Sequence, residues 1–319
     1  TWQQVRQDYW DDGSTKQAKA NQSPYGYGSR NNNERFSYQI TNTLNYTLKL
    51  KELHSFNFLL GQETVYFEDM KLDNEYRNFD EGNFGLNQVG EGQLFKADSG
   101  KGKEGLVSVF GRLTYNYDSR YLFTGTMRAD GSSKFARGEQ WGYFPSVSAA
   151  WRISEEQFME NLKSSFLDNL KLRVGYGTAG NNGIPRNSYA SAFETGYYGQ
   201  NGKEQPTFKP TDVLGNRALK WEKTTTTSLG LDASLFSSRL NLSVDWYNNE
   251  STNLLIKNKI PTSTGYGSQI QNLGAIRNRG IEIVLNTTNI QTKDFSWTTD
   301  FNIAFNRSKV IDLYGDDRD

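Results

Sequence analysis

A long alternation of apolar and polar residues is the feature of this sequence that most restricts its fold. From Phe36 to Leu50 every even position except Asn42 is apolar, and the odd positions between them are polar. Successive side chains of a β-strand point to opposite faces, so the segment predicts a strand with one apolar and one polar face. The pattern recurs and predicts about ten strands of about 9 to 15 residues, whereas globular strands have ~5–6 and bilayer-spanning ones need ~9–11.

The predicted connections between these strands are of two kinds. Four of them are short turns, near residues 51–54, 118–119, 237–238 and 291–294. Four others are long and polar, at 68–105, 131–142, 178–220 and 251–279. Short turns at one rim and long loops at the other are typical of an outer-membrane barrel.

We therefore predict an all-β fold: a segment of a transmembrane antiparallel up-and-down β-barrel with long extracellular loops and short periplasmic turns. One barrel domain would span residues 1–319, with a loop at 1–35, barrel strands at 36–310 and the start of the next loop at 311–319. Residues 154–168 interrupt the short-turn rim, and the spacing of Phe158, Leu162 and Phe166 predicts a small helix there. A soluble β-sandwich also alternates, but it predicts shorter strands and no consistently long-looped end.

Composition argues against several classes of function. The 36 basic and 36 acidic residues give a net charge of zero, so no basic excess favours a nucleic-acid partner. The chain has no cysteine and one histidine, His54, which we expect to be exposed in a short turn. Neither a thiolate or zinc site nor a histidine-based triad is expected, and we predict no metal, no cofactor and no enzyme activity. Glu155 and Glu156 are adjacent rather than convergent, which disfavours a glycosidase pair.

Several blocks of residues occur in a fixed order along the chain. They are Arg128-Ala129-Asp130-Gly131-Ser132-Ser133-Lys134-Phe135, Trp141-Gly142-Tyr143-Phe144-Pro145-Ser146, Ala150-Trp151-Arg152, Leu170-Lys171-Leu172-Arg173-Val174-Gly175-Tyr176-Gly177 with Gly180-Asn181, Leu219-Lys220-Trp221-Glu222, and Asn278-Arg279-Gly280-Ile281-Glu282. Together these blocks resemble the SusC/RagA family of TonB-dependent outer-membrane transporters of Bacteroidetes. Taken residue by residue, the blocks indicate structure rather than chemistry: Asp-Gly suits a turn, and we expect Trp141, Phe144 and Trp151 to pack at the rim.

The resemblance implies import of oligosaccharides or peptides across the outer membrane, driven through the TonB complex. It also implies a SusD-like surface lipoprotein as partner and a multi-pass barrel in contact with outer-membrane lipid. Family barrels have about 22 strands, so the chain looks like a central segment, without the plug, the TonB-contacting region, the signal peptide and the last strands. Two other readings stay open: a self-contained ten-stranded barrel acting as a passive pore or an enzyme, and a secreted β-sandwich adhesin.

Charged residues on the polar faces of the strands are the first candidate functional group. We expect them to line the lumen, where they would contact a plug or an anionic solute. They are Arg112, Arg128, Arg152, Arg173, Asp232, Asp245, Glu282 and Asp300.

Tyrosines in the long loops are the second candidate group, for contact with a solute. Aromatic faces offer stacking area to sugars or peptides, and the neighbouring asparagines offer hydrogen bonds. Packing of the loops on themselves or on a partner is the alternative role. These tyrosines are Tyr25, Tyr27, Tyr197, Tyr198 and Tyr266. Aspartates 312, 316, 317 and 319 near the end of the chain do not match a calcium loop and predict a solvated segment.

Overall fold

The structure is a computed structural model that describes residues 2–11, 26–79, 85–160, 166–200 and 203–313. It divides into two compact units, which are treated separately below. Unit 1 comprises Thr1–Ile40 and Thr64–Leu106, and unit 2 comprises Thr41–Glu63 and Val107–Asp319. No helix among the described residues is long and apolar enough to cross a membrane.

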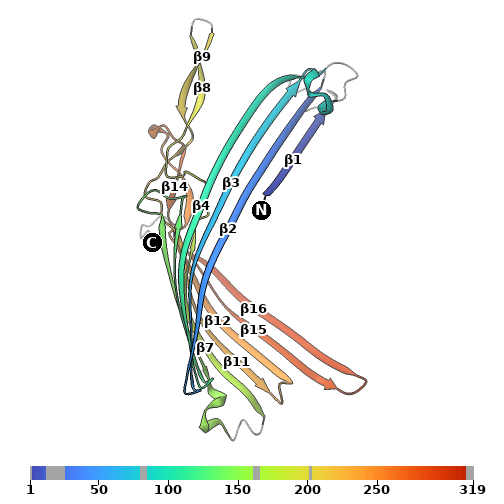
Figure 1. Ribbon diagram of the computed structural model, residues 1–319, viewed down its shortest axis with the longest axis vertical. Helices are drawn as coiled ribbons and strands as arrows, with labels where there is room; N and C mark the ends of the chain where they lie inside the picture. The colour runs from blue at the N-terminus through green and yellow to red at the C-terminus, as the bar shows by residue number, and fades with distance from the viewer. Residues whose placement is uncertain (1, 12–25, 80–84, 161–165, 201–202, 314–319) are drawn as a thin grey trace. The chain divides into compact units, whose positions relative to one another are not determined.

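A single large sheet contains most of the described strands (Figure 1). Its 11 strands follow the order β1-β2-β3-β4-β5-β6-β7-β11-β12-β15-β16. Their bounds are β1 Trp2–Asp11, β2 Tyr27–Leu50, β3 His54–Arg77, β4 Gln93–Tyr117, β5 Tyr121–Ser132, β6 Trp141–Arg152, β7 Leu167–Asn181, β11 Glu222–Leu235, β12 Leu240–Thr252, β15 Ala275–Gln291 and β16 Ser296–Asp312. The predicted all-β barrel architecture, with strands that follow one another in sequence order, is confirmed.

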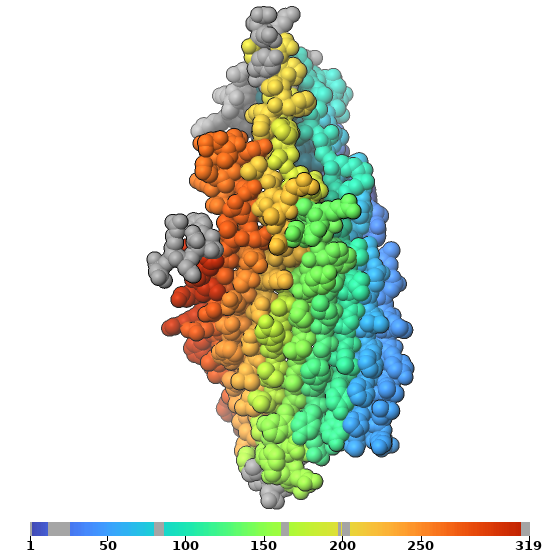
Figure 2. All heavy atoms as spheres, turned by 90° about the vertical axis from the view of Figure 1, so that its left-hand side faces the viewer, coloured from blue at the N-terminus to red at the C-terminus, as the bar shows by residue number. Residues whose placement is uncertain are grey.

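Smaller elements fill the long connections of unit 2. Strands β8 (Phe193–Gln200) and β9 (Lys203–Pro210) form a separate two-stranded hairpin, coloured yellow in Figure 2. Strands β10 (Val213–Leu214), β14 (Ser268–Asn272) and β13 (Leu255–Lys259) form a three-stranded sheet, with the 3-10 turn η4 (Thr262–Thr264) between β13 and β14.

Two of the short connections are tight turns with an unusual backbone. In the turn Tyr117–Arg120 the amide of Arg120 donates to the carbonyl of Tyr117, and Asp118 and Ser119 have φ of 47° and 56°. The turn Phe236–Arg239 has the same bond, with Ser237 and Ser238 at 56° and 58°. Positive φ at both central residues defines the type I′ turn, whose twist matches that of a two-stranded hairpin.

The main sheet of unit 2 has one apolar and one polar face. Leu229, Trp246, Ile281 and Phe305 lie opposite one another across β11, β12, β15 and β16. One position along, Gly230, Asp245, Glu282 and Ala304 form the corresponding row on the other face. Many large side chains of the apolar face are exposed, among them Phe123, Val147, Val174, Leu229, Trp246, Ile281, Phe301 and Phe305. This is the arrangement expected of strands that turn one face to lipid.

The prediction of loops at 1–35 and 68–105 is wrong. β1 occupies Trp2–Asp11 and pairs with the first ten residues of β2 from Tyr27, while β3 continues to Arg77 and β4 already starts at Gln93. The joining segment between β3 and β4 holds the 3-10 helix η1 (Gly85–Glu91). These parts of the strands carry polar residues on both faces, so the alternation that marks a half-apolar strand is absent from them.

Two smaller expectations concern the short-turn end. Residues 153–159 form two 3-10 turns, η2 (Ile153–Glu155) and η3 (Gln157–Met159), and residues 161–165, the middle of the predicted helix, lie outside the described part. His54 begins β3 and is half-buried rather than exposed. Its Nδ1 lies 2.9 Å from the hydroxyl of Tyr115, and its ring centroid lies 4.9 Å from that of Tyr117. The histidine therefore belongs to an aromatic cluster at the short-turn end.

Candidate functional site

The eight charged residues predicted for the lumen share one face of the sheet in unit 2. Cross-strand pairing places Arg173 opposite Ala150 and Gly230, and Gly230 opposite Asp245. Asp245 in turn lies opposite Glu282. The other five lie on the same face because side chains two or four residues apart on a strand point to the same side. They are Arg152 on β6, Asp232 on β11, Asp300 on β16, Arg128 on β5 and Arg112 on β4, which is four residues after Ser108, the acceptor of a hydrogen bond from Arg128. That this polar face lines the lumen remains a prediction.

Arg173 is the centre of the first cluster on the polar face. Its Nε and Nη2 donate to the two carboxylate oxygens of Asp232, each at 2.8 Å, and Nη2 also reaches Asp245 Oδ1 at 2.9 Å. Lys171 Nζ lies 2.9 Å from Asp232 Oδ2, and the Ser243 hydroxyl is within 2.9 Å of Asp232 Oδ1. The forked guanidinium thus links three strands, β7, β11 and β12, through a bidentate and a single ion pair.

Gly230 makes room for this cluster, which sequence reasoning missed. A Cβ at position 230 would lie 2.7 Å from Arg173 Cζ and would collide with an Asp245 carboxylate oxygen. With any other residue at position 230, the Arg173 and Asp245 side chains would have to shift from the positions in which they meet. The signal in the sequence is a glycine inside a strand, which often marks a close approach of another group.

Replacing Arg173 with glutamine is expected to lower the free energy of unfolding of the full-length protein by about 1–3 kcal/mol. The change removes the cation that the Asp232 and Asp245 carboxylates share and leaves Lys171, which binds Asp232, as the cation of the described cluster. The effect is limited because the side chains of Lys171, Asp232 and Asp245 are partly exposed to solvent. Urea unfolding in lipid vesicles measures it. Adding Asp232→Asn and Asp245→Asn should restore most of the loss, and strict additivity of the three changes would contradict the cluster.

Arg128 forms a second cluster on the same face, and it explains why arginine and aspartate are two positions apart in the Arg128-Ala129-Asp130 block. Its Nε donates to Asp130 Oδ1 at 2.8 Å, and its Nη2 donates to Ser108 Oγ at 2.8 Å and lies 3.3 Å from Glu63 Oε1. Residues two apart on a strand lie on the same face, so the two side chains meet. Ser108 and Asp130 are buried, and the cluster joins β3, β4 and β5.

A buried apolar group formed by residues of the long connections and the adjoining strand β6 brings together blocks that are far apart in the sequence. We call it the loop core and define it as Phe135, Phe144, Leu219 and Trp221, which are at most 6% exposed. The Trp221 ring centroid lies 5.4 Å from that of Phe135 and 5.5 Å from that of Phe144, and its Nε1 donates to the Gln140 carbonyl at 2.9 Å. Three of the recognised blocks therefore hold the β5–β6 connection against the start of β11.

Amide side chains extend the loop core by hydrogen bonds. Asn182 Nδ2 donates to the buried Ser132 Oγ at 3.0 Å, and Asn181 Nδ2 donates to Glu222 Oε1 at 3.2 Å. Asn272 Oδ1 accepts from the Lys220 amide at 2.8 Å, and its Nδ2 donates to the Lys220 carbonyl at 2.8 Å. The connections that follow β5, β7 and β12 are thereby tied to one another, a convergence that the individual blocks did not predict.

The expected rim packing of three aromatics is only partly correct. Phe144 is in the loop core, but Trp141 is 49% exposed and lies over Gly131. Trp151 is at the other end of β6, where its Nε1 donates to Glu156 Oε1 at 3.0 Å. The hydroxyl of Tyr121 donates to the same oxygen at 2.6 Å, and these two bonds lower the pKa of Glu156.

The five candidate tyrosines do not form one cluster in the described part. Tyr27 is the first residue of β2 and pairs with Asp11, so the expectation that it lies in a loop is wrong. Tyr197 and Tyr198 belong to β8 by their backbone, and Tyr25 lies outside the described residues. Tyr266 is half-buried beside η4. A role for these residues in solute contact stays a prediction.

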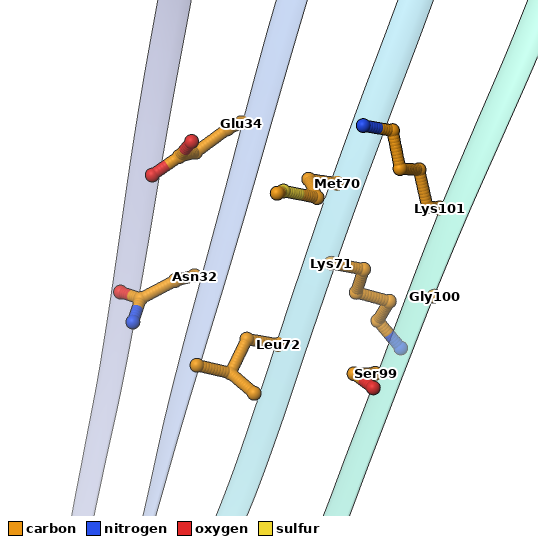
Figure 3. A pocket seen from close by; sticks show the side chains of 8 residues that line it. All are labelled: Asn32, Glu34, Met70, Lys71, Leu72, Ser99, Gly100 and Lys101. Carbon is orange, nitrogen blue, oxygen red and sulfur yellow. The ribbon is translucent and has the colours of Figure 1, made fainter.

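Unit 1 contains a groove of about 440 Å³ that sequence reasoning missed (Figure 3). Met70 and Leu72 on β3 lean toward β2, which carries Asn32 and Glu34, while Lys101 on β4 reaches toward Met70. An apolar floor between charges of both signs could accommodate an apolar or zwitterionic segment. Within the described ranges, no group of three or more His, Cys, Asp or Glu side chains is arranged to hold a metal ion.

Comparison with known proteins agrees with the two-faced antiparallel sheet. The family model described as "TonB dependent receptor-like, beta-barrel" matches residues 1–319. The chain belongs to this family. It is therefore part of an outer-membrane β-barrel, and the predicted localisation is confirmed.

Two curated relatives show where this TonB-dependent receptor segment fits. TonB-dependent receptor P39 of Formosa agariphila is 34% identical over 291 residues, which cover 88% of the segment and 27% of that protein. TonB-dependent receptor SusC of Bacteroides thetaiotaomicron is 34% identical over 318 residues, which cover 92% of the segment and 30% of that protein. The segment thus spans less than a third of either relative, and the resemblance to the SusC/RagA family is confirmed.

Solved structures agree with the sequence relatives. The structure of the RagAB peptide importer in the "closed-closed" state has a TM-score of 0.85 and 25% identity, covering 98% of the segment and 34% of that chain. The outer-membrane transporter YddB of Escherichia coli, at a TM-score of 0.54 and 10% identity, shares the fold alone.

An ion pair in unit 1 gives a pH prediction. Asp8 on β1 lies opposite Arg30, the fourth of the 24 residues of β2, so 20 residues of sequence separate Arg30 from the end of β2, about twice the ~9–11 residues that a strand needs to cross a bilayer; we therefore expect this pair to be outside the membrane-spanning part. Arg6 and Arg30 Nε bind the Asp8 carboxylate, the latter at 3.2 Å, and Arg30 Nη2 also donates to the Leu86 carbonyl at 2.6 Å. Hydrogen bonds from Arg6 first and Arg30 second lower the pKa of Asp8 to about 2.

We expect the contribution of Asp8 to the stability of β1 to be complete above pH ~4 and to be lost as pH falls through about 2. The sign follows because the carboxylate has a lower pKa in the folded protein than in the unfolded chain. The pH dependence of the Asp8 carboxyl ¹³C shift measures this pKa in the full-length protein. In Arg30→Gln the midpoint should rise but stay below the ordinary value because Arg6 remains; an unchanged midpoint would show that Arg30 does not act on Asp8.

Proposed function

We propose that the chain is wall and loop structure of an outer-membrane importer that takes up oligosaccharides or peptides with energy delivered through TonB. The observation that carries the proposal is the family match over the whole chain together with a sheet that is apolar on one face and charged on the other. Because the segment covers less than a third of its relatives, import is proposed for the complete protein.

The polar face would be the lumen wall in this importer. The Arg173 and Arg128 clusters place fixed charges on it, and their side chains remain partly exposed for contact with a plug. Glu282 and Asp300 add carboxylates to the same face. A wall with paired charges of both signs suits a plug that must be held firmly and yet be displaced, since part-exposed ion pairs each contribute little.

The long connections would receive the solute beneath a SusD-like surface lipoprotein. Support comes from the SusC relative and from the RagAB structures, which are those of a peptide importer or transporter. The loop core would keep the loops in one arrangement so that solute and partner meet a preformed surface. Oligosaccharide and peptide both remain candidate solutes, and Tyr266 and the β8–β9 hairpin are candidate contact points.

Deletion of the gene for the full-length protein in the source bacterium tests the proposal. The strain should lose growth on one class of oligosaccharide or on peptides as sole nutrient, while growth on the corresponding monomers is unchanged. Loss of the neighbouring lipoprotein gene or of TonB should give the same defect. Growth that survives the loss of TonB but not of this gene would instead favour the passive pore, and degradation of the polymer by the purified protein would favour the enzyme.

A further inference from the structure

Four basic residues lie together on neighbouring strands of unit 2. We call Arg277, Arg279, Arg307 and Lys309 the outer basic patch. Strands β15 and β16 lie side by side (Figure 1), with Arg279 directly opposite Arg307 and Arg277 directly opposite Lys309. Like charges at directly opposed positions of an antiparallel pair repel one another, so the sheet alone gives no reason for this arrangement.

The outer basic patch is on the apolar face, immediately beyond its last apolar row. Ile281 and Phe305 form the row that precedes Arg279 and Arg307, and Ile290 and Trp297 form the row nearest the short turn. From Trp297 to Phe305 the strand advances eight residues, or about 27 Å, and at a tilt of ~40° this spans ~20 Å, close to the ~25 Å apolar band of such barrels. The patch therefore lies at headgroup level on the long-loop side, which is the outer leaflet.

Three of the four charges have no ion-pair partner among the residues that the structure describes. Arg277 is bound by Glu250 Oε2, at 3.0 Å from its Nη2. Arg279, Arg307 and Lys309 are exposed, and no described carboxylate forms a salt bridge with them. In unit 1, by contrast, Lys101 and Lys103 share the Glu68 carboxylate at 2.5 and 3.5 Å. The patch is thus a local excess of positive charge in a chain with no net charge.

A groove of about 490 Å³ joins the patch to the apolar band. Trp246, Ile281 and Phe305 contribute its apolar lining, and Arg279 and Arg307 contribute its charged end. Two guanidinium groups offer forked donors that match a phosphate, and the aromatic and aliphatic side chains beside them match an acyl chain. A molecule with a phosphorylated head and hydrocarbon tails fits both ends of the groove.

We propose that the outer basic patch binds the phosphorylated headgroup of a lipid in the outer leaflet of the outer membrane. Arg279 and Arg307 hold a phosphate, Lys309 adds attraction at the rim, and the acyl chains run along Ile281 and Phe305 toward the bilayer centre. The bound phosphate removes the repulsion between the opposed arginines. The site is separate from the polar face and does not depend on which solute the importer carries.

Lipid binding to the purified full-length protein in detergent tests this inference, read by native mass spectrometry. The probes are lipid A with its phosphates, the same lipid A dephosphorylated, and inorganic phosphate. The wild-type protein should retain phosphorylated lipid A and bind the dephosphorylated lipid much more weakly. Arg279→Gln with Arg307→Gln should weaken binding about 25-fold, since each basic residue near an anionic surface contributes a factor of about five.

The matched control is Lys257→Gln with Lys259→Gln, which removes two exposed charges from β13 and should leave lipid binding unchanged. Both double variants must run as folded barrels on unheated gels, because loss of folding would lower binding for another reason. Equal binding by wild type and the Arg279 and Arg307 variant would overturn the proposal. Competition by millimolar inorganic phosphate as effective as that by lipid A would overturn the lipid as ligand and leave an anion site.

Discussion

Truncating Trp221 to alanine should release the long extracellular connections from one another while the barrel strands stay paired. Trp221 is 6% exposed and contacts both Phe135 and Phe144, so its loss leaves a cavity in the loop core and removes one of the two hydrogen bonds that the Gln140 carbonyl accepts, the other coming from the Ser132 amide. Removing a buried tryptophan costs about 3–5 kcal/mol. Limited proteolysis of intact cells should then cleave the connections after β5 and β7 at least tenfold faster, and nutrient uptake should fall.

Trp141→Ala is the matched control for this experiment. The side chain is of the same type and begins β6, the strand that also contributes Phe144, but it is 49% exposed and is not part of the loop core. We expect its truncation to change proteolysis by less than twofold. If both variants are cleaved at the same rate, or if Trp221→Ala is as resistant as the wild type, the loop core does not order these connections.

Replacing Ile283 with lysine should prevent stable insertion or lower the free energy of unfolding by about 2–4 kcal/mol. Ile283 lies opposite Val244 and Ile303 in the middle of the apolar band, and a charge on the lipid face is most costly near the bilayer midplane. Urea unfolding of the full-length protein in lipid vesicles measures the change, with the fraction of heat-modifiable barrel as a second readout.

The neighbouring residue provides a direct comparison. Val284 is on the opposite face, between Ser243 and Asn302, so a lysine there would face the acidic polar surface near Asp245. We expect Val284→Lys to change the stability by less than ~0.5 kcal/mol. Similar losses for both variants would mean that the two faces are not exposed to different solvents, and the assignment of the apolar face to lipid would fail.

The alternation of residues was enough to predict the strands where they cross the bilayer, because lipid on one side forces every second side chain to be apolar. Leu240–Val244 and Phe301–Phe305 are examples, and both lie within observed strands. The same rule could not find β1 or the far halves of β3 and β4, since strands with water on both sides need no apolar face. Their length comes from pairing with neighbours, which a single strand does not reveal.

The candidate site was predictable only in part. Alternation placed Arg173, Asp232 and Asp245 on one face correctly, but their contact through Gly230 depends on the pairing of β7, β11 and β12. The loop core likewise needs Phe135 and Trp221 to meet across more than 80 residues, although their blocks were recognisable separately. Burial of an aromatic in a connection is decided by the partner segment, so the residue type alone does not predict it.

The two type I′ turns have a consequence for how the protein is assembled. Each closes its hairpin with two central residues that are not glycine, at a conformational cost of ~1–2 kcal/mol for each residue. A slip by one residue would turn every side chain of the following strand to the other face, sending Asp245 to lipid and Trp246 to water. The turn at Phe236–Arg239 therefore fixes the register of β11 and β12. A hairpin that has formed this turn already has its apolar side chains on the face that will contact lipid when insertion begins.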